Sequence, residues 1–242
     1  MRPERRPRLG RAGRCRGFTL VELVVAIVIF GVMAATLTVF VRPAFEAYLA
    51  VRDRADLAAQ AGHALARMQA DVRAAVPNSI RTPAANCIEM LPTRGGGRYR
   101  RAADTVNDSA PGCTPGASCS APLDPTQATT VFDVLTPLNP VPAPGDFVVV
   151  DNQNPGDVYA GSNRAAIGAV AVPAAAYGRH RITVAATAFP AGYDGGRFVV
   201  VPASQRAVFY VCSGADGTLD ANGNGRGTLV RLSSYGFNAA YP

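Results

Sequence analysis

The sequence predicts an α+β protein, in which one long N-terminal helix packs on an antiparallel β-sheet with long loops. Three observations support this class. An apolar run occupies residues 18–41, a helical repeat of apolar residues follows it as far as Pro77, and strand-like segments separated by turns fill residues 78–242. Strands without regular helices between them favour antiparallel pairing, because parallel strands need crossover connections that are usually helical.

The apolar run has the length of a membrane-spanning helix. Its 24 residues would extend about 36 Å, which exceeds a hydrocarbon core of about 30 Å. It is also longer than the apolar region of a cleaved secretory signal. Seven arginines precede it in residues 1–17. By the positive-inside rule they are expected to hold the N-terminus in the cytoplasm, which places the C-terminal domain in the periplasm.

Most of the positive charge belongs to this N-terminal leader. The formal net charge of the 242 residues is +7, and residues 1–17 account for +6 because Glu4 is their only acid. Residues 18–242 are therefore close to neutral. A basic nucleic-acid-binding domain needs arginines gathered on a folded face, so the distribution argues against nucleic acid as a partner.

Glu22 is the only charged residue inside the apolar run. An acid within a membrane helix costs about 2.5–3.5 kcal/mol on insertion scales and commonly has a function. No arginine lies between position 16 and Glu22, but a chain cut after Gly17 would present a free amine on Phe18. The alternative is that Glu22 is a chance acid at the membrane interface.

The segment GFTLVE at residues 17–22, between a basic leader and a long apolar run, resembles the prepilin cleavage motif of type IV pilins and type II secretion pseudopilins. The resemblance implies that a prepilin peptidase cuts after Gly17 and methylates Phe18. It also implies that Glu22 pairs with the N-terminus of a neighbouring pilin subunit during assembly. Such a chain would move from the inner membrane into a pilus or pseudopilus.

The helical pattern continues beyond the apolar run. Pro43 should kink the helix or mark its exit from the membrane, and Pro77 should end it, which gives one helix over residues 18–76. The predicted division is a leader at 1–17, a transmembrane helix at 18–42, an amphipathic half at 43–77 and a β-rich domain at 78–242. An apolar stripe on the second half should pack on the sheet: Phe45, Leu49, Leu57, Ala61, Leu65, Met68 and Val72.

Seven strands are predicted from their content of Val, Phe, Tyr and Thr, at residues 87–91, 130–136, 146–150, 180–187, 197–201, 207–212 and 228–235. Residues 94–128 and 151–178 are predicted to be loop-rich insertions. The first contains Arg94, Arg98, Arg100 and Arg101 around Tyr99. This cluster is either a contact site for an anionic partner or a solvated loop.

Four of the five cysteines follow the apolar run, since Cys15 lies in the leader. An even number on the oxidising side of a membrane favours two disulfides, and three pairings are possible. We favour Cys113–Cys119, which closes a short loop, and Cys87–Cys212, which would join two strands. No Cys-x-x-Cys pattern or nearby histidine indicates a metal site.

A weak calcium candidate lies in residues 214–227, where Asp220, Asn222, Asn224 and Gly225 match the first half of an EF-hand loop. Asp216 could supply an extra carboxylate. The match then fails, because Arg231 stands where the bidentate glutamate belongs. The alternative is a hairpin turn between the last two strands. No other cofactor is predicted.

No enzyme motif is present, because His63 and His180 come without a nucleophile pattern such as G-x-S-x-G. We therefore expect a structural subunit. Residues 65–81, 208–212 and 229–237 resemble MshO-type minor pilins of MSHA pilus biogenesis. The alternatives are a J-type minor pseudopilin of type II secretion, which shares the Arg-Met-x-x-Asp pattern, and a pilin-borne adhesin or binding module.

Overall fold

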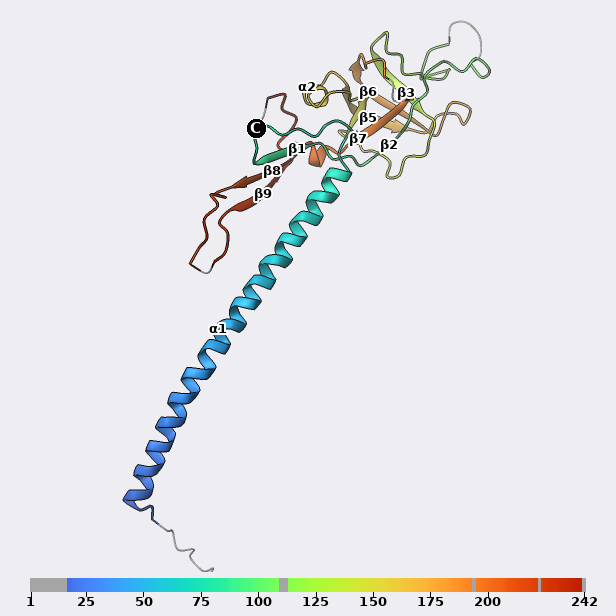
Figure 1. Cartoon of the computed structure of the whole chain (residues 1–242). Coiled ribbons are helices and arrows are strands. Elements are labelled where there is room, and N and C mark those ends of the chain that lie inside the picture. The colour runs from blue at the N-terminus through green and yellow to red at the C-terminus, as the bar shows by residue number, and fades with distance from the viewer. Residues whose placement is uncertain (1–16, 109–112, 193–194, 222, 241–242) are drawn as a thin grey trace, which may run out of the picture. The chain divides into compact units, whose positions relative to one another are not determined.

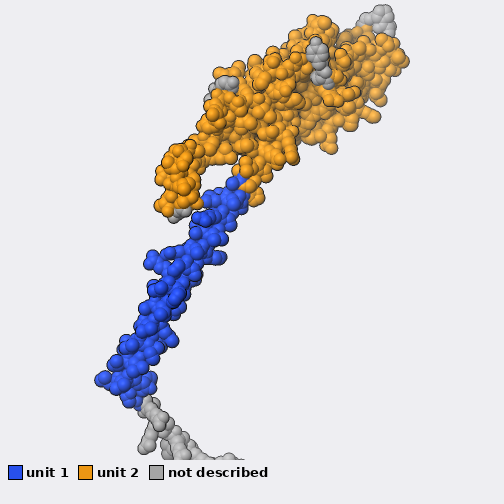
Figure 2. All heavy atoms as spheres, in the orientation of Figure 1, with its two compact units in different colours: residues 1–61 blue, residues 62–242 orange. Residues whose placement is uncertain are grey.

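The computed structural model describes residues 17–108, 113–192, 195–221 and 223–240, and Figure 1 shows its elements. The chain divides into two compact units, residues 1–61 and 62–242 (Figure 2). From Leu20 onward, the described part of the first unit is helix. The second unit contains the last turns of that helix and all the described strands.

Helix α1 runs over Leu20–Arg73 and continues through Pro43, so Pro43 does not end it. The helix stops four residues before Pro77, earlier than the sequence predicts. The reason is that the next backbone groups pair elsewhere. The carbonyl of Ala74 accepts hydrogen bonds from the amide and hydroxyl of Thr93, and the amide of Val76 donates to Leu91.

The end of the predicted apolar stripe packs on a sheet. Met68, Val72 and Ala75 contact a cluster formed by Met90, Val208 and Tyr210. Leu65 is exposed, as are the stripe residues Phe45, Leu49 and Leu57 of the first unit. Within the second unit, the predicted packing of the stripe on a sheet is therefore seen in the last turns of α1.

The sheet beneath the helix end has three antiparallel strands in the order β1-β8-β9. These are Cys87–Met90, Val208–Ser213 and Thr228–Ser233. The segment before β1 extends the pairing, because Arg81 and Glu89 exchange backbone hydrogen bonds. The first and last strands of the domain thus share one sheet.

A second sheet has six antiparallel strands in the order β2-β7-β4-β5-β6-β3. They are Gly95–Arg98, Arg197–Val201, Phe147–Val150, Arg164–Ala171, His180–Thr187 and Thr129–Val134. Its two edge strands meet, since Tyr99 bridges to Val134 and the amide of Leu135 donates to the carbonyl of Arg98 at 2.8 Å. The sheet therefore closes at this point into a small barrel.

The two faces of the six-stranded sheet carry separate cores. Inside the barrel, Phe132 makes edge-to-face contacts with Tyr99 and Phe198. On the outer face, Val149 and Val201 pack with Val76, Leu91, Val158 and Tyr159. The last two belong to the short helix α2, Asp157–Ala160. A 3-10 turn at Ala203–Gln205 joins β7 to β8 and so links the two sheets.

The α+β class with antiparallel sheets is confirmed, and each of the seven predicted strands has a counterpart. Two strands were not predicted. Strand β2 lies in the first supposed loop, and β5 together with helix α2 lies in the second. Both insertions are therefore more ordered than the sequence indicates.

Candidate functional site: the N-terminal motif and its surroundings

The residues around the predicted cleavage point lie just outside the helix. Gly17, Phe18 and Thr19 precede α1, and the amide of Glu22 donates to the hydroxyl oxygen of Thr19 at 3.3 Å. This is an N-cap bond from the first residue of a Thr-x-x-Glu pattern. The Gly17–Phe18 peptide bond thus lies outside the helix, next to a capped helix end.

Glu22 lies in the first helical turn and is exposed, and Phe18 keeps 75% of its surface accessible. An acid is favourable at a helix N-terminus because unpaired amides leave a partial positive charge there. Among the residues that the structure describes, no cationic side chain forms an ion pair with Glu22. Its countercharge is therefore not one of these side chains.

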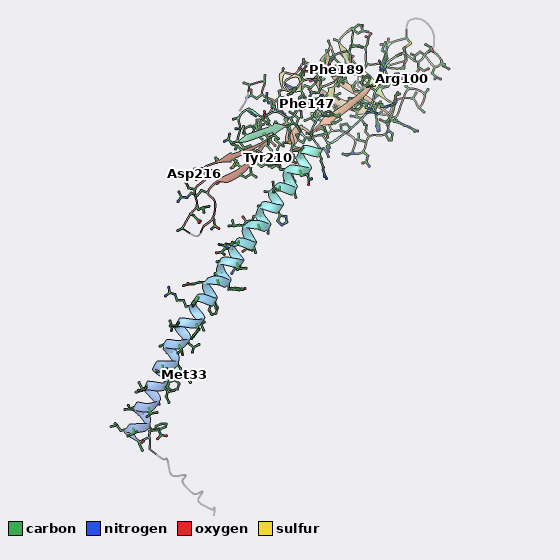
Figure 3. The ribbon with its side chains drawn as sticks, viewed as in Figure 1. Met33, Arg100, Phe147, Phe189, Tyr210 and Asp216 are labelled. Carbon is green, nitrogen blue, oxygen red and sulfur yellow. A yellow bond between two sulfur atoms is a disulfide. The ribbon has the colours of Figure 1, made fainter. Side chains whose placement is uncertain are left out.

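Helix α1 is long and apolar enough to cross a membrane by its length and composition. Its apolar side chains around Met33 are exposed all round the helix (Figure 3). The hydroxyls of Thr36 and Thr38 donate to backbone carbonyls one turn earlier, at 2.9 and 2.8 Å. In a bilayer core, where no water is available, these bonds would satisfy both hydroxyl groups.

Residues 13–38 match the family model of the prokaryotic N-terminal methylation motif. The motif indicates the type IV pilin and pseudopilin class. For a type IV pilin-like chain it implies processing by prepilin peptidase and assembly with other pilins, and such proteins are structural. The apolar helix and the motif together fit a pilin anchored in the inner membrane. No curated protein and no solved structure matches the chain.

The structure contains the disulfide Cys113–Cys119, with its Cα atoms 5.7 Å apart. It does not contain the expected second bridge, because Cys87 and Cys212 are free thiols. Cys87 lies opposite Val211 in the β1–β8 register, so Cys212 is one residue away from the position that faces Cys87. Since neighbouring residues of a strand point to opposite faces, the two thiols lie on different sides of the sheet.

The calcium candidate is a hairpin loop between β8 and β9, and it begins near Asp216 (Figure 3). Asp216 accepts hydrogen bonds from the amide and hydroxyl of Thr218. Asp220 accepts from the amide of Asn224 at 2.8 Å, while Asn222 lies outside the described residues. In the described part of the loop, these carboxylates therefore hold turns, which is the alternative that the sequence offered.

The predicted basic cluster at residues 94–101 is dispersed in the structure. Arg100 donates to the carbonyls of Ala176 and Tyr177, and it lies 3.6 Å from Asp104. Tyr99 is buried in the barrel. Arg100 and Tyr99 thus make contacts within the domain, and the five residues do not form one cationic surface.

The two histidines lie in unrelated surroundings. His63 is exposed on α1, whereas His180 Nε2 accepts a hydrogen bond from the backbone amide of Leu138 at 3.2 Å. Across the described residues, no three His, Cys, Asp or Glu side chains are grouped so that they could hold a metal ion.

Proposed function

We propose that this chain is a minor type IV pilin-like subunit of an MSHA-type pilus. Prepilin peptidase removes residues 1–17 and methylates Phe18, and the subunit then enters the fibre from the inner membrane with its β-rich domain in the periplasm. The observation that carries the proposal is the capped helix start at GFTLVE, where Glu22 has no cationic side chain within the described chain.

Glu22 would pair with the Phe18 amine of an adjacent subunit. A charge in an apolar bundle is tolerated only when it is paired, and a single such pair specifies one axial register between neighbouring helices. The exposed apolar side chains of residues 20–41 would supply the surrounding contacts. They would pass from lipid to neighbouring helices during assembly.

The three stretches that resemble MshO-type minor pilins contact one another in the fold. Asp71, in the first stretch, accepts hydrogen bonds from Tyr210 at 2.6 Å and from Arg231 at 2.8 Å, which lie in the other two. The resemblance therefore concerns residues that work together. A J-type minor pseudopilin of type II secretion is the alternative, because the Arg67-Met68-x-x-Asp71 pattern is common to both.

Substitution of Glu22 by Ala tests the assembly role. The variant should be cut after Gly17 and methylated at Phe18, as intact-mass measurement would show, but it should be missing from sheared pili. The matched control is Glu46→Ala, which removes an exposed acid further along α1. Normal incorporation of the Glu22→Ala variant would contradict the proposal.

A deletion strain separates the two subtypes. An MSHA-type subunit predicts loss of surface pili with normal secretion of type II substrates. Accumulation of those substrates in the periplasm, with pili intact, would instead favour the pseudopilin alternative.

A further inference from the structure

The outer face of the six-stranded sheet brings together two arginines that are far apart in the sequence. Arg98 of β2 lies directly opposite Arg197 of β7 in an antiparallel pair. Directly opposed residues point to the same face, and like charges in this position are destabilising. Both side chains are exposed, and neither forms an ion pair with another described residue. The fold thus holds two unneutralised guanidinium groups side by side.

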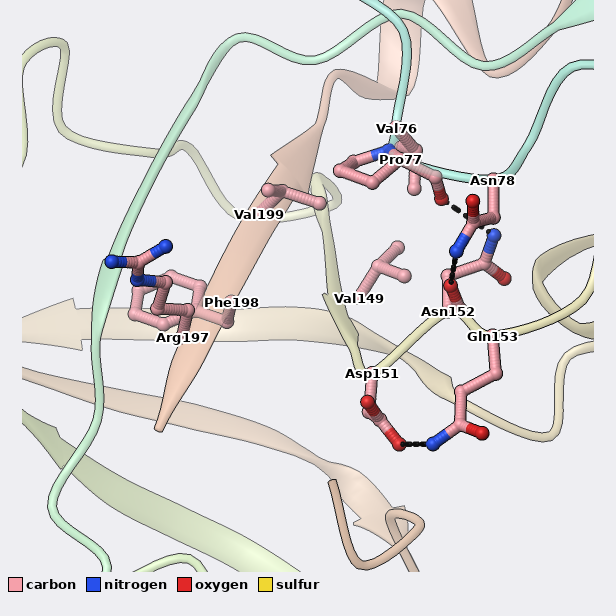
Figure 4. A pocket seen from close by; sticks show the side chains of 10 residues that line it. All are labelled: Val76, Pro77, Asn78, Val149, Asp151, Asn152, Gln153, Arg197, Phe198 and Val199. Carbon is pink, nitrogen blue, oxygen red and sulfur yellow. Dashed lines mark hydrogen bonds between the residues drawn. The ribbon is translucent and has the colours of Figure 1, made fainter. Parts of the chain in front are cut away.

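A cleft of about 600 Å³ begins beside this pair. Arg197 lines it, and Val149 and Val199, which are register partners on β4 and β7, form an apolar floor. Asp151 and Gln153 lie on the rim, where their side chains point toward each other and apart from Arg197 (Figure 4). The cleft therefore has a cationic end, an apolar middle and a rim of carboxylate and amide groups.

The rim is held in a fixed form. Asn78 donates from its amide to the carbonyl of Asn152, and Asn152 donates back to the carbonyl of Pro77, at 2.9 and 2.8 Å. Asn78 and Asp151 both adopt positive φ values, 59° and 51°. Asn and Asp tolerate left-handed backbone better than other non-glycine residues, and here they shape the turns that form the rim.

We propose that this cleft binds an extended acidic peptide segment of another protein subunit. A carboxylate of the segment is held by Arg98 and Arg197, a neighbouring apolar side chain covers Val149 and Val199, and a backbone N–H of the segment donates to Asp151. Two adjacent guanidinium groups suit a carboxylate because each can donate two parallel hydrogen bonds. The proposal is independent of the pilus subtype.

The same geometry disfavours a nucleic acid strand. Asp151 follows Val150, the last residue of β4, and lines the same cleft as Arg197. A phosphodiester chain that continued past the arginines would meet this carboxylate. A peptide has a donor N–H to offer at that position and no charge that repeats along its backbone.

The test uses the full chain in detergent micelles and two fluorescein-labelled hexapeptides with blocked ends. The probes are Gly-Gly-Leu-Asp-Gly-Gly and its Asn counterpart. We expect fluorescence anisotropy to show binding of the Asp peptide and at least about ten-fold weaker binding of the Asn peptide, since a hydrogen bond to a charged group contributes roughly one decade of affinity or more. Arg98→Gln and Arg197→Gln should each weaken the Asp peptide by about ten-fold.

Arg226→Gln is the matched control, because it removes one exposed positive charge in the β8–β9 hairpin loop, away from the cleft residues. Unchanged peptide affinity in this variant supports the site. Three results would overturn the proposal. They are no binding of the Asp peptide, an equal loss in Arg226→Gln, or displacement of the Asp peptide by a single-stranded DNA oligonucleotide in an Arg197-dependent manner.

Discussion

At the scale of single residues, the domain depends on two buried acids that the sequence did not single out. Asp71, at the end of α1, accepts hydrogen bonds from Tyr210 and Arg231. Glu89, in β1, is fully buried and pairs with Arg81 at 2.5 Å. Asp71 therefore joins segments that lie far apart along the chain, and Glu89 does the same because it also accepts a hydrogen bond from the Tyr235 hydroxyl. Both acids differ in this from Glu22, which is exposed.

The Asp71 network predicts a specific pH dependence of stability. Burial by itself raises the pKa of Asp71, but the hydrogen bonds from Arg231 and Tyr210 outweigh it and hold the pKa below its usual 3.8. A lowered pKa in the folded state stabilises the protein above the unfolded-state pKa of about 3.9, and the contribution is lost as the pH falls through the folded-state value. The Asp71→Asn variant should lack this contribution.

We expect Asp71→Asn to lower the free energy of unfolding by about 2 kcal/mol at pH 7. Urea titrations at several pH values should show the difference from the wild type shrinking below about pH 4, where the wild type loses the charge. Asp53→Asn is the control, because Asp53 is exposed on the same helix. A constant difference down to strongly acid pH would contradict the role given to the Asp71 carboxylate.

The Arg81–Glu89 pair predicts strong coupling between two substitutions. Arg81 also donates to the carbonyls of Asn238 and Ala240 and lies over the ring of Tyr159 at 3.7 Å, so it ties the C-terminal segment to the core. Glu89→Ala leaves this buried guanidinium without its carboxylate, which should cost about 3–5 kcal/mol. A double-mutant cycle with Arg81→Met should give a coupling energy of about 2 kcal/mol or more. Additive losses would show that the pair is not coupled.

At the scale of elements, strands with strong local preferences were predictable and strands defined by their partners were not. Strand β2 has the sequence GGGR, which carries no strand preference, and it forms because β7 pairs with it. Strand β5, RAAIGAVA, is made mainly of small residues and lies between β4 and β6. The side chains of these two strands do not predict a strand, because pairing with neighbouring strands determines their structure.

The register between paired strands also could not be predicted from the sequence. The two cysteines of β1 and β8 suggest a bridge, but a shift of one residue puts their side chains on opposite faces. The Arg98–Arg197 pair is the converse case, because two residues that are far apart in the sequence are neighbours in the sheet. The sequence placed Arg98 in a local cluster, and only the β2–β7 pairing brings Arg197 beside it while Arg100 turns into the domain.

The register gives a direct prediction for the thiols of the mature chain. Alkylation with iodoacetamide in denaturant, without reductant, should label Cys87 and Cys212 and leave Cys113 and Cys119 unlabelled. Mass spectrometry of peptides cut at arginine would locate the labels. After prior reduction all four should be labelled, which serves as the control. An unlabelled Cys87 and Cys212 pair before reduction would mean that the two strands pair in another register.

At the scale of the whole molecule, the sequence indicated the class of protein and the N-terminal processing motif, because these depend on contiguous residues. The composition of residues 18–41 and the GFTLVE hexapeptide carry that information without any folding. The cleft beside Arg197 required the fold, since its residues come from the segment that follows α1, from β4 and the loop after it, and from β7. A near-neutral domain thus contains a local pair of charges that the net charge conceals.

The pairing of early and late strands also sets the order in which this domain can form. Strand β2 needs β7, so the six-stranded sheet cannot be completed before Val201 has emerged. Strand β1 needs β8, and β8 needs β9, so the three-stranded sheet cannot be completed before Ser233 has emerged. Long-range pairings of this kind make folding slow compared with local helix formation. The helix anchor is therefore available while the rest of the chain is still unfolded. A chain threaded N-terminus first would be tethered before it is folded, and a nascent chain stalled before β7 would expose unpaired strands at the membrane surface.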